Sequence, residues 1–144
     1  MASAFTKIDH VGIAVADLDI AVAAYARLTG SAPAHRQVVA ADGIEAVMFE
    51  VGESRIELLG STGPESKIAG FLARRGSGLH HVAYGVDDVQ ASLDRYAALG
   101  LQLLDTCPRH GAGGRLVAFL HPSAANGVLT ELCQSDEELA GTHP

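Results

Sequence analysis

The sequence has too few cysteines, basic residues and long apolar runs for several common classes of protein. Its two cysteines, Cys107 and Cys133, form no disulfide framework and lack zinc-knuckle spacing, so we expect two thiols. A formal net charge of -7 disfavours binding to nucleic acid or anionic membranes. No apolar run approaches the roughly 20 residues of a membrane span, and MASAFTKIDH does not resemble a signal peptide. We therefore expect a cytoplasmic protein that binds neither nucleic acid nor membrane.

The sequence does contain enough apolar material for one folded domain. Its 144 residues are 48% hydrophobic, which predicts a single globular domain over residues 1–144. Within it, a shift of 71 residues (79 minus 8) aligns residues 8–30 with 79–100. The matched positions include His10 with His81, Val15 with Val86 and Tyr25 with Tyr96. This agreement indicates an internal duplication.

Each half of the duplication begins with a strand, followed by an acidic helix cap and a helix. Asp17 is the expected cap in the first half and Asp87 or Asp88 in the second. Further strands follow, predicted at 32–40, 45–52 and 55–60 in the first half and at 101–106, 115–122 and 128–134 in the second. The predicted fold class is α+β, with tandem βαβββ modules at 5–60 and 78–134. Residues 61–77 form a linker that carries a short helix.

Four ionisable residues recur at equivalent places on these predicted strands. His10 and His81 lie on the opening strands, and Glu57 and Glu131 lie on the closing strands, 74 residues apart (131 minus 57). Two imidazoles and two carboxylates related by a duplication suit a divalent transition metal. Strand alternation puts His80 on the face opposite to His81, where we expect packing or a hydrogen bond to a neighbouring segment.

Glu45 lies on a strand that the duplication would place beside this metal site. Alternation puts Glu45, Val47 and Phe49 on one face of that strand. A carboxylate there could act as a general acid or base, and the alternative is a solvated residue at the strand end.

A glycine-rich segment, PRHGAGGRLVAFLHP, leads into one of the later strands. Gly113 and Gly114 would allow a ligand to approach the backbone closely, and Arg109 or Arg115 could meet its carboxylate or phosphate. The alternative is a flexible hairpin loop with solvated charges. The segment has neither the Walker pattern nor the Rossmann fingerprint.

The duplicated modules with paired His and Glu positions resemble the vicinal oxygen chelate superfamily. The stretches KIDHVGIAV, VGESRIELLG, SKIAGFLARRGSGLHHVAYGVDDV and PRHGAGGRLVAFLHPSAANGVLTEL resemble the methylmalonyl-CoA epimerase family over nearly the whole chain. The resemblance implies a curved, partly open mixed sheet around a metal site. It also implies a homodimer that acts on methylmalonyl-CoA.

The resemblance further implies a divalent metal, Co²⁺ first and Ni²⁺, Mn²⁺ or Zn²⁺ as alternatives. Its ligands would be His10, Glu57, His81 and Glu131, although some family members have glutamine at the Glu57 position. Carrying over the acid/base pair gives Glu45 and Glu131, which would move the C2 proton of the substrate through an enolate. Substrate contacts would fall on Arg109, Gly113 and Gly114.

Two other functions remain open at this point. One is a glyoxalase I-type lactoylglutathione lyase, because glutamate is also common at the glyoxalase position that corresponds to Glu57. The other is a non-catalytic small-molecule binding protein of the same fold.

Overall fold

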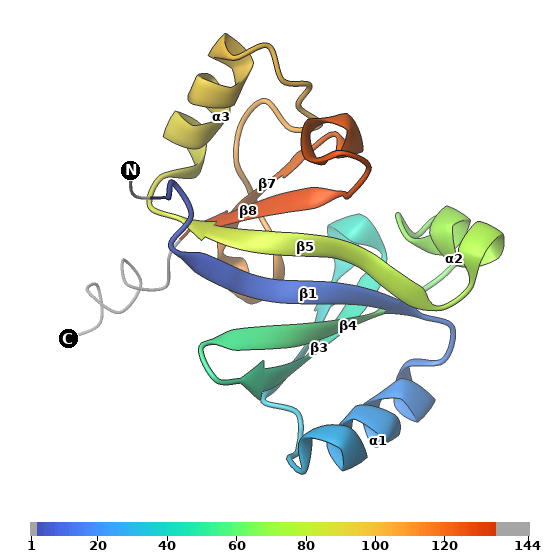
Figure 1. Cartoon of the computed structure of the whole chain (residues 1–144). Helices are drawn as coiled ribbons and strands as arrows, with labels where there is room; N and C mark the ends of the chain where they lie inside the picture. Colours follow the sequence, from blue (N-terminus) through green and yellow to red (C-terminus); the bar gives the residue numbers. More distant parts are fainter. Residues whose placement is uncertain (1–2, 135–144) are drawn as a thin grey trace. The chain divides into compact units, whose positions relative to one another are not determined.

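The computed structural model describes residues 3–134 of the chain. Within this range the chain forms two compact units, one of residues 10–80 and one of residues 3–9 together with 81–134. The predicted linker helix belongs to the first unit, whereas residues 3–9 belong to the second. Each unit contains one βαβββ module almost completely (Figure 1).

The first unit is a four-stranded mixed sheet with one long helix. Its strands lie in the order β2-β3-β4-β1, with β1 and β4 parallel and the other pairs antiparallel. The elements are β1 (Lys7–Val15, shared with the second unit), α1 (Leu18–Thr29), β2 (His35–Val39), the 3-10 turn η1 (Ala40–Asp42), β3 (Ile44–Val51), β4 (Ser54–Ser61) and α2 (Ala69–Arg75).

The second unit repeats this arrangement. Its strands lie in the order β5-β8-β7-β6, with β5 and β8 parallel. The elements are β5 (Gly78–Val86, shared with the first unit), α3 (Val89–Ala98), β6 (Arg109–His110), the 3-10 turn η2 (Ala112–Gly114), β7 (Leu116–Leu120), the 3-10 turn η3 (Pro122–Ala125) and β8 (Thr130–Gln134). The expectation of two βαβββ modules is therefore confirmed.

Equivalent acidic caps start the two long helices. The Asp17 carboxylate accepts a hydrogen bond from the backbone N–H of Ile20 at 3.1 Å, and the Asp88 carboxylate accepts one from Ala91 at 3.0 Å. Each bond satisfies an N–H that has no partner within the helix. These two caps are also separated by 71 residues, so the duplication extends to the capping hydrogen bonds.

Each unit buries its own apolar core between the helix and the sheet. In the first unit Val15, Val47, Phe49 and Leu58 are buried, and side chains of α1 pack against them. In the second unit the core is formed by α3 with the inner positions of the strands, namely Val86, Val89, Leu93, Tyr96, Ala118, Leu120 and Leu132. The helices thus cover one face of each half-sheet and leave the other face available for polar side chains.

The segment 101–106 differs from its predicted strand. It forms an isolated bridge between Leu103 and Leu120. Leu104 and Asp105 both donate backbone hydrogen bonds to the Phe119 carbonyl, and His121 donates one to the Gln102 carbonyl, each at 3.1 Å. Because two successive N–H groups share one carbonyl, the regular ladder ends there. The edge strand of the second unit is instead the two-residue β6.

Among the described residues, no helix combines the length and the apolar character that a membrane span requires. Cys107 is exposed and Cys133 is buried, and neither forms a disulfide, as expected.

Candidate metal centre

The first unit brings two of the predicted ligands together. In the parallel pair β1–β4, His10 lies opposite Arg55 and Gly12 lies opposite Glu57, so His10 and Glu57 share one face of the sheet. The distance from His10 Nε2 to Glu57 Oε1 is 3.5 Å. Both residues are buried, at 3% and 5% exposure. Burying two ionisable side chains costs free energy unless polar partners or a bound ion compensate for it. This buried pair is therefore a candidate metal site.

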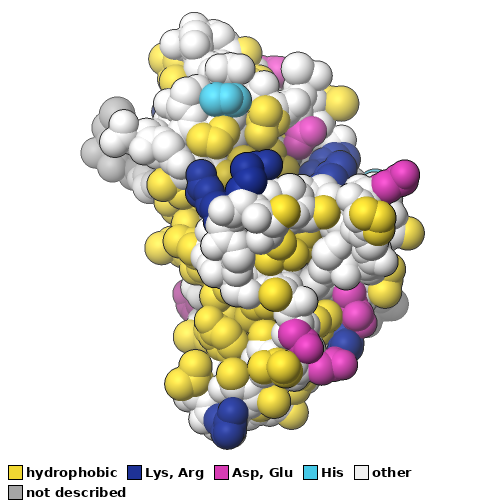
Figure 2. Space-filling view, turned by 90° about the vertical axis from the view of Figure 1, so that its right-hand side faces the viewer, with side chains coloured by type: hydrophobic (Ala, Val, Ile, Leu, Met, Phe, Trp, Pro, Cys, Tyr) yellow, Lys and Arg dark blue, Asp and Glu magenta, His cyan; other side chains and the backbone are white. Residues whose placement is uncertain are grey.

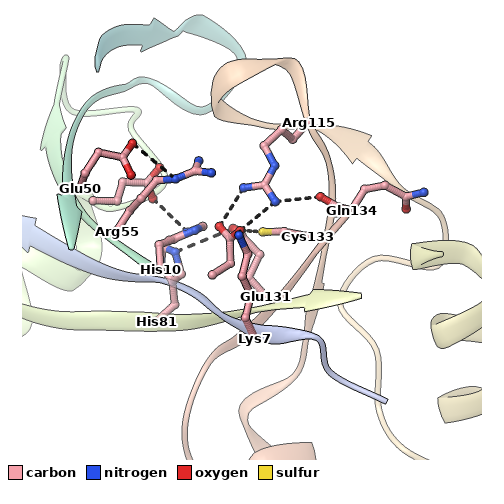
Figure 3. Close-up of polar contacts among 11 residues, drawn as sticks. Lys7, His10, Glu50, Arg55, His81, Arg115, Glu131, Cys133 and Gln134 are labelled. Carbon is pink, nitrogen blue, oxygen red and sulfur yellow. Dashed lines mark hydrogen bonds and ion pairs between the residues drawn. The ribbon is translucent and has the colours of Figure 1, made fainter. Parts of the chain in front are cut away.

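The second unit contains the same arrangement. In the parallel pair β5–β8, Glu131 lies opposite Ala83, and His81 precedes Ala83 by two residues, as His10 precedes Gly12. The distance from His81 Nε2 to Glu131 Oε2 is 3.8 Å, and both residues are buried (Figure 3). The duplication therefore preserves the residue types together with their strand register.

The donor atoms of each pair lie close enough together to approach one metal ion. Separations of 3.5 and 3.8 Å exceed the usual N–H···O distance of about 2.9 Å. Two ligands bound to one ion at about 2.1 Å each lie roughly 3–3.5 Å apart. The separation in the first unit is at the upper end of this range, and the separation in the second unit is slightly longer. Imidazole nitrogen and carboxylate oxygen are also suitable donors for a divalent transition metal, so the residues fit that ion.

Two further side chains contact the His81–Glu131 pair. Phe119 lies opposite Glu131 in the β7–β8 register, and its ring meets the His81 ring edge-on, with centroids 5.5 Å apart. The Cys133 thiol donates a hydrogen bond to Glu131 Oε1 at 3.1 Å. These contacts restrict the orientation of the imidazole and of the carboxylate.

His80 points away from this pair, as alternation predicts. Its ring contacts Phe71 of α2 edge-on, with centroids 5.1 Å apart. The expectation that His80 packs on a neighbouring segment is confirmed, and the doubled histidine separates into two residues with different surroundings.

Glu45 does not lie on the ligand face, contrary to its expected place beside the site. In the β3–β4 register Met48 lies opposite Glu57, so the even-numbered residues of β3 share the face of Glu57. Glu45 therefore points to the other face together with Val47 and Phe49, which pack in the core beneath α1. The same alternation that groups these three residues places them all on the helix side.

An ion pair holds Glu45 on that side. Arg36 of β2 donates from Nε to Glu45 Oε2 at 2.8 Å and from Nη2 to Asp19 Oδ1 at 3.1 Å. The hydrogen bond to Glu45, followed by the one to Asp19, raises the pKa of Arg36 above its ordinary value. This exposed network ties β2 and β3 to the first turn of α1.

The two arginines of the glycine-rich segment, Arg109 and Arg115, lie in different environments. Arg115 donates to both carboxylate oxygens of Asp9, at 2.8 and 2.9 Å. It also donates to the carbonyl of Gln134 at 2.7 Å (Figure 3). Asp9 is fully buried and Arg115 is 6% exposed. Arg115 thus meets a carboxylate of its own chain, where a ligand carboxylate or phosphate was expected. Sequence reasoning missed Asp9, and its charge inside a buried strand was the available signal.

Arg109 is more accessible than Arg115. Its guanidinium lies over the Phe119 ring, 5.4 Å from the centroid, and Nε lies 3.5 Å from Asp105 Oδ2. Gly113 and Gly114 follow in η2 with φ of 75° and 74°, a backbone conformation that favours glycine. Arg109 therefore adjoins the ring that contacts His81, and the two glycines shape the loop beside it.

Comparison with known proteins identifies relatives over nearly the whole chain. The model of the Glyoxalase/Bleomycin resistance protein/Dioxygenase superfamily matches residues 9–119. An ethylmalonyl-CoA/methylmalonyl-CoA epimerase of Cereibacter sphaeroides is 38% identical over 130 residues, which are 89% of this chain and 97% of the relative.

Solved structures agree with this similarity. The crystal structure of methylmalonyl-CoA epimerase from Mycobacterium tuberculosis is 35% identical, with a TM-score of 0.89 over 99% of this chain and 96% of the other. A methylmalonyl-CoA epimerase in complex with methylmalonyl-CoA and NH4+ is 37% identical, with a TM-score of 0.86 over 91% of this chain and 95% of the other. The fold expected from the sequence is therefore confirmed.

Proposed function

Because the chain belongs to the methylmalonyl-CoA epimerase family, within the glyoxalase superfamily, we propose that it interconverts (2R)- and (2S)-methylmalonyl-CoA. The observation that carries the proposal is the repeated buried His–Glu pair, in which both residues occupy the same strand register in each unit. Such a reaction removes a proton next to a thioester and returns it to the opposite face. A site built from two equivalent halves suits chemistry on two faces of one planar intermediate.

We propose that the two pairs together hold one divalent metal, with His10, Glu57, His81 and Glu131 as ligands. The bound ion would act as a Lewis acid toward the thioester oxygen and the substrate carboxylate. Co²⁺ is our first choice, with Ni²⁺, Mn²⁺ and Zn²⁺ as alternatives, since imidazole and carboxylate donors suit all four ions.

We assign proton transfer on one face of the substrate to Glu131. The second transfer is not assigned to Glu45, which is paired with Arg36 on the helix side, nor to Glu57, because family members with glutamine at that position have no base there. Glu131 takes or returns the C2 proton on its face, and a water molecule or another residue serves the opposite face. Because coordination stabilises the charged carboxylate and lowers its basicity, the carboxylate that accepts the proton must be held only loosely.

Arg109, Gly113 and Gly114 are our proposed contacts for the acyl-CoA. Arg109 is partly exposed, at 32% for the side chain, and adjoins Phe119, which contacts His81. Its guanidinium suits a carboxylate or a phosphate of the substrate. The backbone of Gly113 and Gly114 has no side chain to obstruct a ligand.

We further propose that the protein works as a homodimer in the cytoplasm. Large apolar residues lie exposed, among them Ile8 and Leu79, which are equivalent in the duplication, and hydrophobic side chains reach the surface on the face shown in Figure 2. A partner subunit would cover such positions. The two thiols without a disulfide suit a reducing compartment. Light scattering on the purified protein measures the oligomeric state.

The test of the proposed function is deuterium uptake at C2 of methylmalonyl-CoA by metal-loaded protein. Rapid exchange with interconversion of the isomers supports the epimerase. The hemithioacetal of methylglyoxal and glutathione is assayed in parallel. If the protein turns over this compound and leaves methylmalonyl-CoA unchanged, it is a lyase and the proposal is wrong.

A further inference from the structure

Arg55 of β4 places a positive charge on the sheet face that carries His10 and Glu57. In the β1–β4 register Arg55 lies opposite His10, and it precedes Glu57 by two residues on the same strand face. Its side chain is only 18% exposed. Arg55 is therefore a largely buried guanidinium next to both proposed ligands of this unit.

The partner of Arg55 across β3–β4 is Glu50. The two residues are register partners, and Arg55 Nε lies 3.9 Å from Glu50 Oε1 (Figure 3). That separation is at the long end for an ion pair, and the Glu50 side chain is 60% exposed. A long pair with one solvated member contributes little to stability, so a substrate carboxylate can displace Glu50 from the guanidinium at small cost.

A cation beside metal ligands disfavours binding of the metal alone, because like charges repel. The arrangement becomes favourable when the ligand that binds with the metal is an anion. An acyl-CoA of the malonyl type carries one free carboxylate close to its reacting carbon, and guanidinium is the side chain that matches a carboxylate with two parallel hydrogen bonds.

We propose that Arg55 binds the free carboxylate of the acyl group and thereby selects malonyl-type thioesters over acyl-CoAs without that carboxylate. This inference rests on the proposed function and adds a residue that sets its substrate class. Without substrate, Glu50 forms an ion pair with the Arg55 guanidinium, and the substrate carboxylate takes the place of Glu50 on binding.

The experiment compares two ligands that differ in the free carboxylate. Malonyl-CoA and propionyl-CoA are titrated by calorimetry into metal-loaded wild type, Arg55→Gln, Arg55→Lys and Arg27→Gln. The last variant is the matched control, since Arg27 is an exposed arginine of α1. Metal content and the unfolding temperature are measured on each protein.

We expect Arg55→Gln to lower the preference for malonyl-CoA over propionyl-CoA by about 10-fold or more, the effect of one charged hydrogen bond or two. Arg55→Lys should restore part of the preference, because it keeps the charge but loses the bidentate geometry. Arg27→Gln should leave it unchanged.

Three results would overturn the assignment. An unchanged preference would show that Arg55 does not meet the carboxylate. An equal loss of affinity for malonyl-CoA and for propionyl-CoA would place Arg55 against the coenzyme A portion. Loss of metal or of folding in both Arg55 variants, with an unchanged preference in the folded fraction, would make its role structural. Failure of the proposed function is distinguishable, since wild type would then leave the C2 proton of methylmalonyl-CoA unexchanged.

Discussion

Arg36 and Glu45 join β2 to β3 through a hydrogen bond of 2.8 Å on the face that α1 covers. This pair separates Glu45 from the face that carries Glu57. We therefore expect Glu45→Gln to keep C2 deuterium uptake within about threefold of wild type. The loss of one exposed ion pair should change the free energy of unfolding little. A hundredfold slower uptake with normal folding would return Glu45 to the site.

Glu131→Gln should have the opposite profile. An amide oxygen can still bind a metal, but an amide cannot accept the C2 proton. We expect metal content to persist and deuterium uptake to fall by about 10²-fold or more, the typical contribution of a general base. Metal content and deuterium uptake are measured on the same preparation. A fully active Glu131→Gln protein would contradict the acid/base role of Glu131.

The adjacent histidines provide a matched pair of variants for the metal. His81→Ala should lose both metal and activity, because its imidazole faces Glu131 at 3.8 Å. His80→Ala removes only the ring contact with Phe71 and should keep the metal. Metal analysis of protein purified without added metal reads the difference, and metal retention by His81→Ala would defeat the ligand assignment.

The buried pair Asp9–Arg115 should act on stability rather than on chemistry. Asp9→Ala leaves the Arg115 guanidinium buried without its carboxylate, and a loss of about 3–5 kcal/mol in the free energy of unfolding is expected. Replacing both residues by apolar side chains of similar size should recover much of this loss. Denaturant unfolding measures both values, and equal destabilisation by the single and double replacements would argue against the pair.

The sequence alone predicts the His–Glu pairs because duplication makes them visible without any knowledge of contacts. It also predicts α1 and α3, because an acidic cap, Asp17 in one half and Asp87 or Asp88 in the other, is followed by apolar residues at helical spacing. The structure identifies Asp88 as the second cap. The face of Glu45 was harder to predict. Alternation groups Glu45 with Val47 and Phe49, but only the register with β4 decides which face this is. Two core residues beside Glu45 already indicated the helix side.

Other features depend on contacts between distant residues. Asp9 and Arg115 are 106 residues apart, and nothing local to either residue specifies the other. The 101–106 segment has the composition of a strand, yet Leu104 and Asp105 both bond to one Phe119 carbonyl, and the ladder stops. Arg55 reads as a solvated charge in the sequence until the β1–β4 register places it beside His10.

The most direct test of the central claim is deuterium exchange at C2 of methylmalonyl-CoA, measured with metal-loaded protein before and after removal of the metal by a chelator. The proposed metal centre predicts rapid exchange in both isomers, loss of exchange after chelation and recovery when Co²⁺ is added back. Exchange that continues unchanged in protein shown to be free of metal would contradict it.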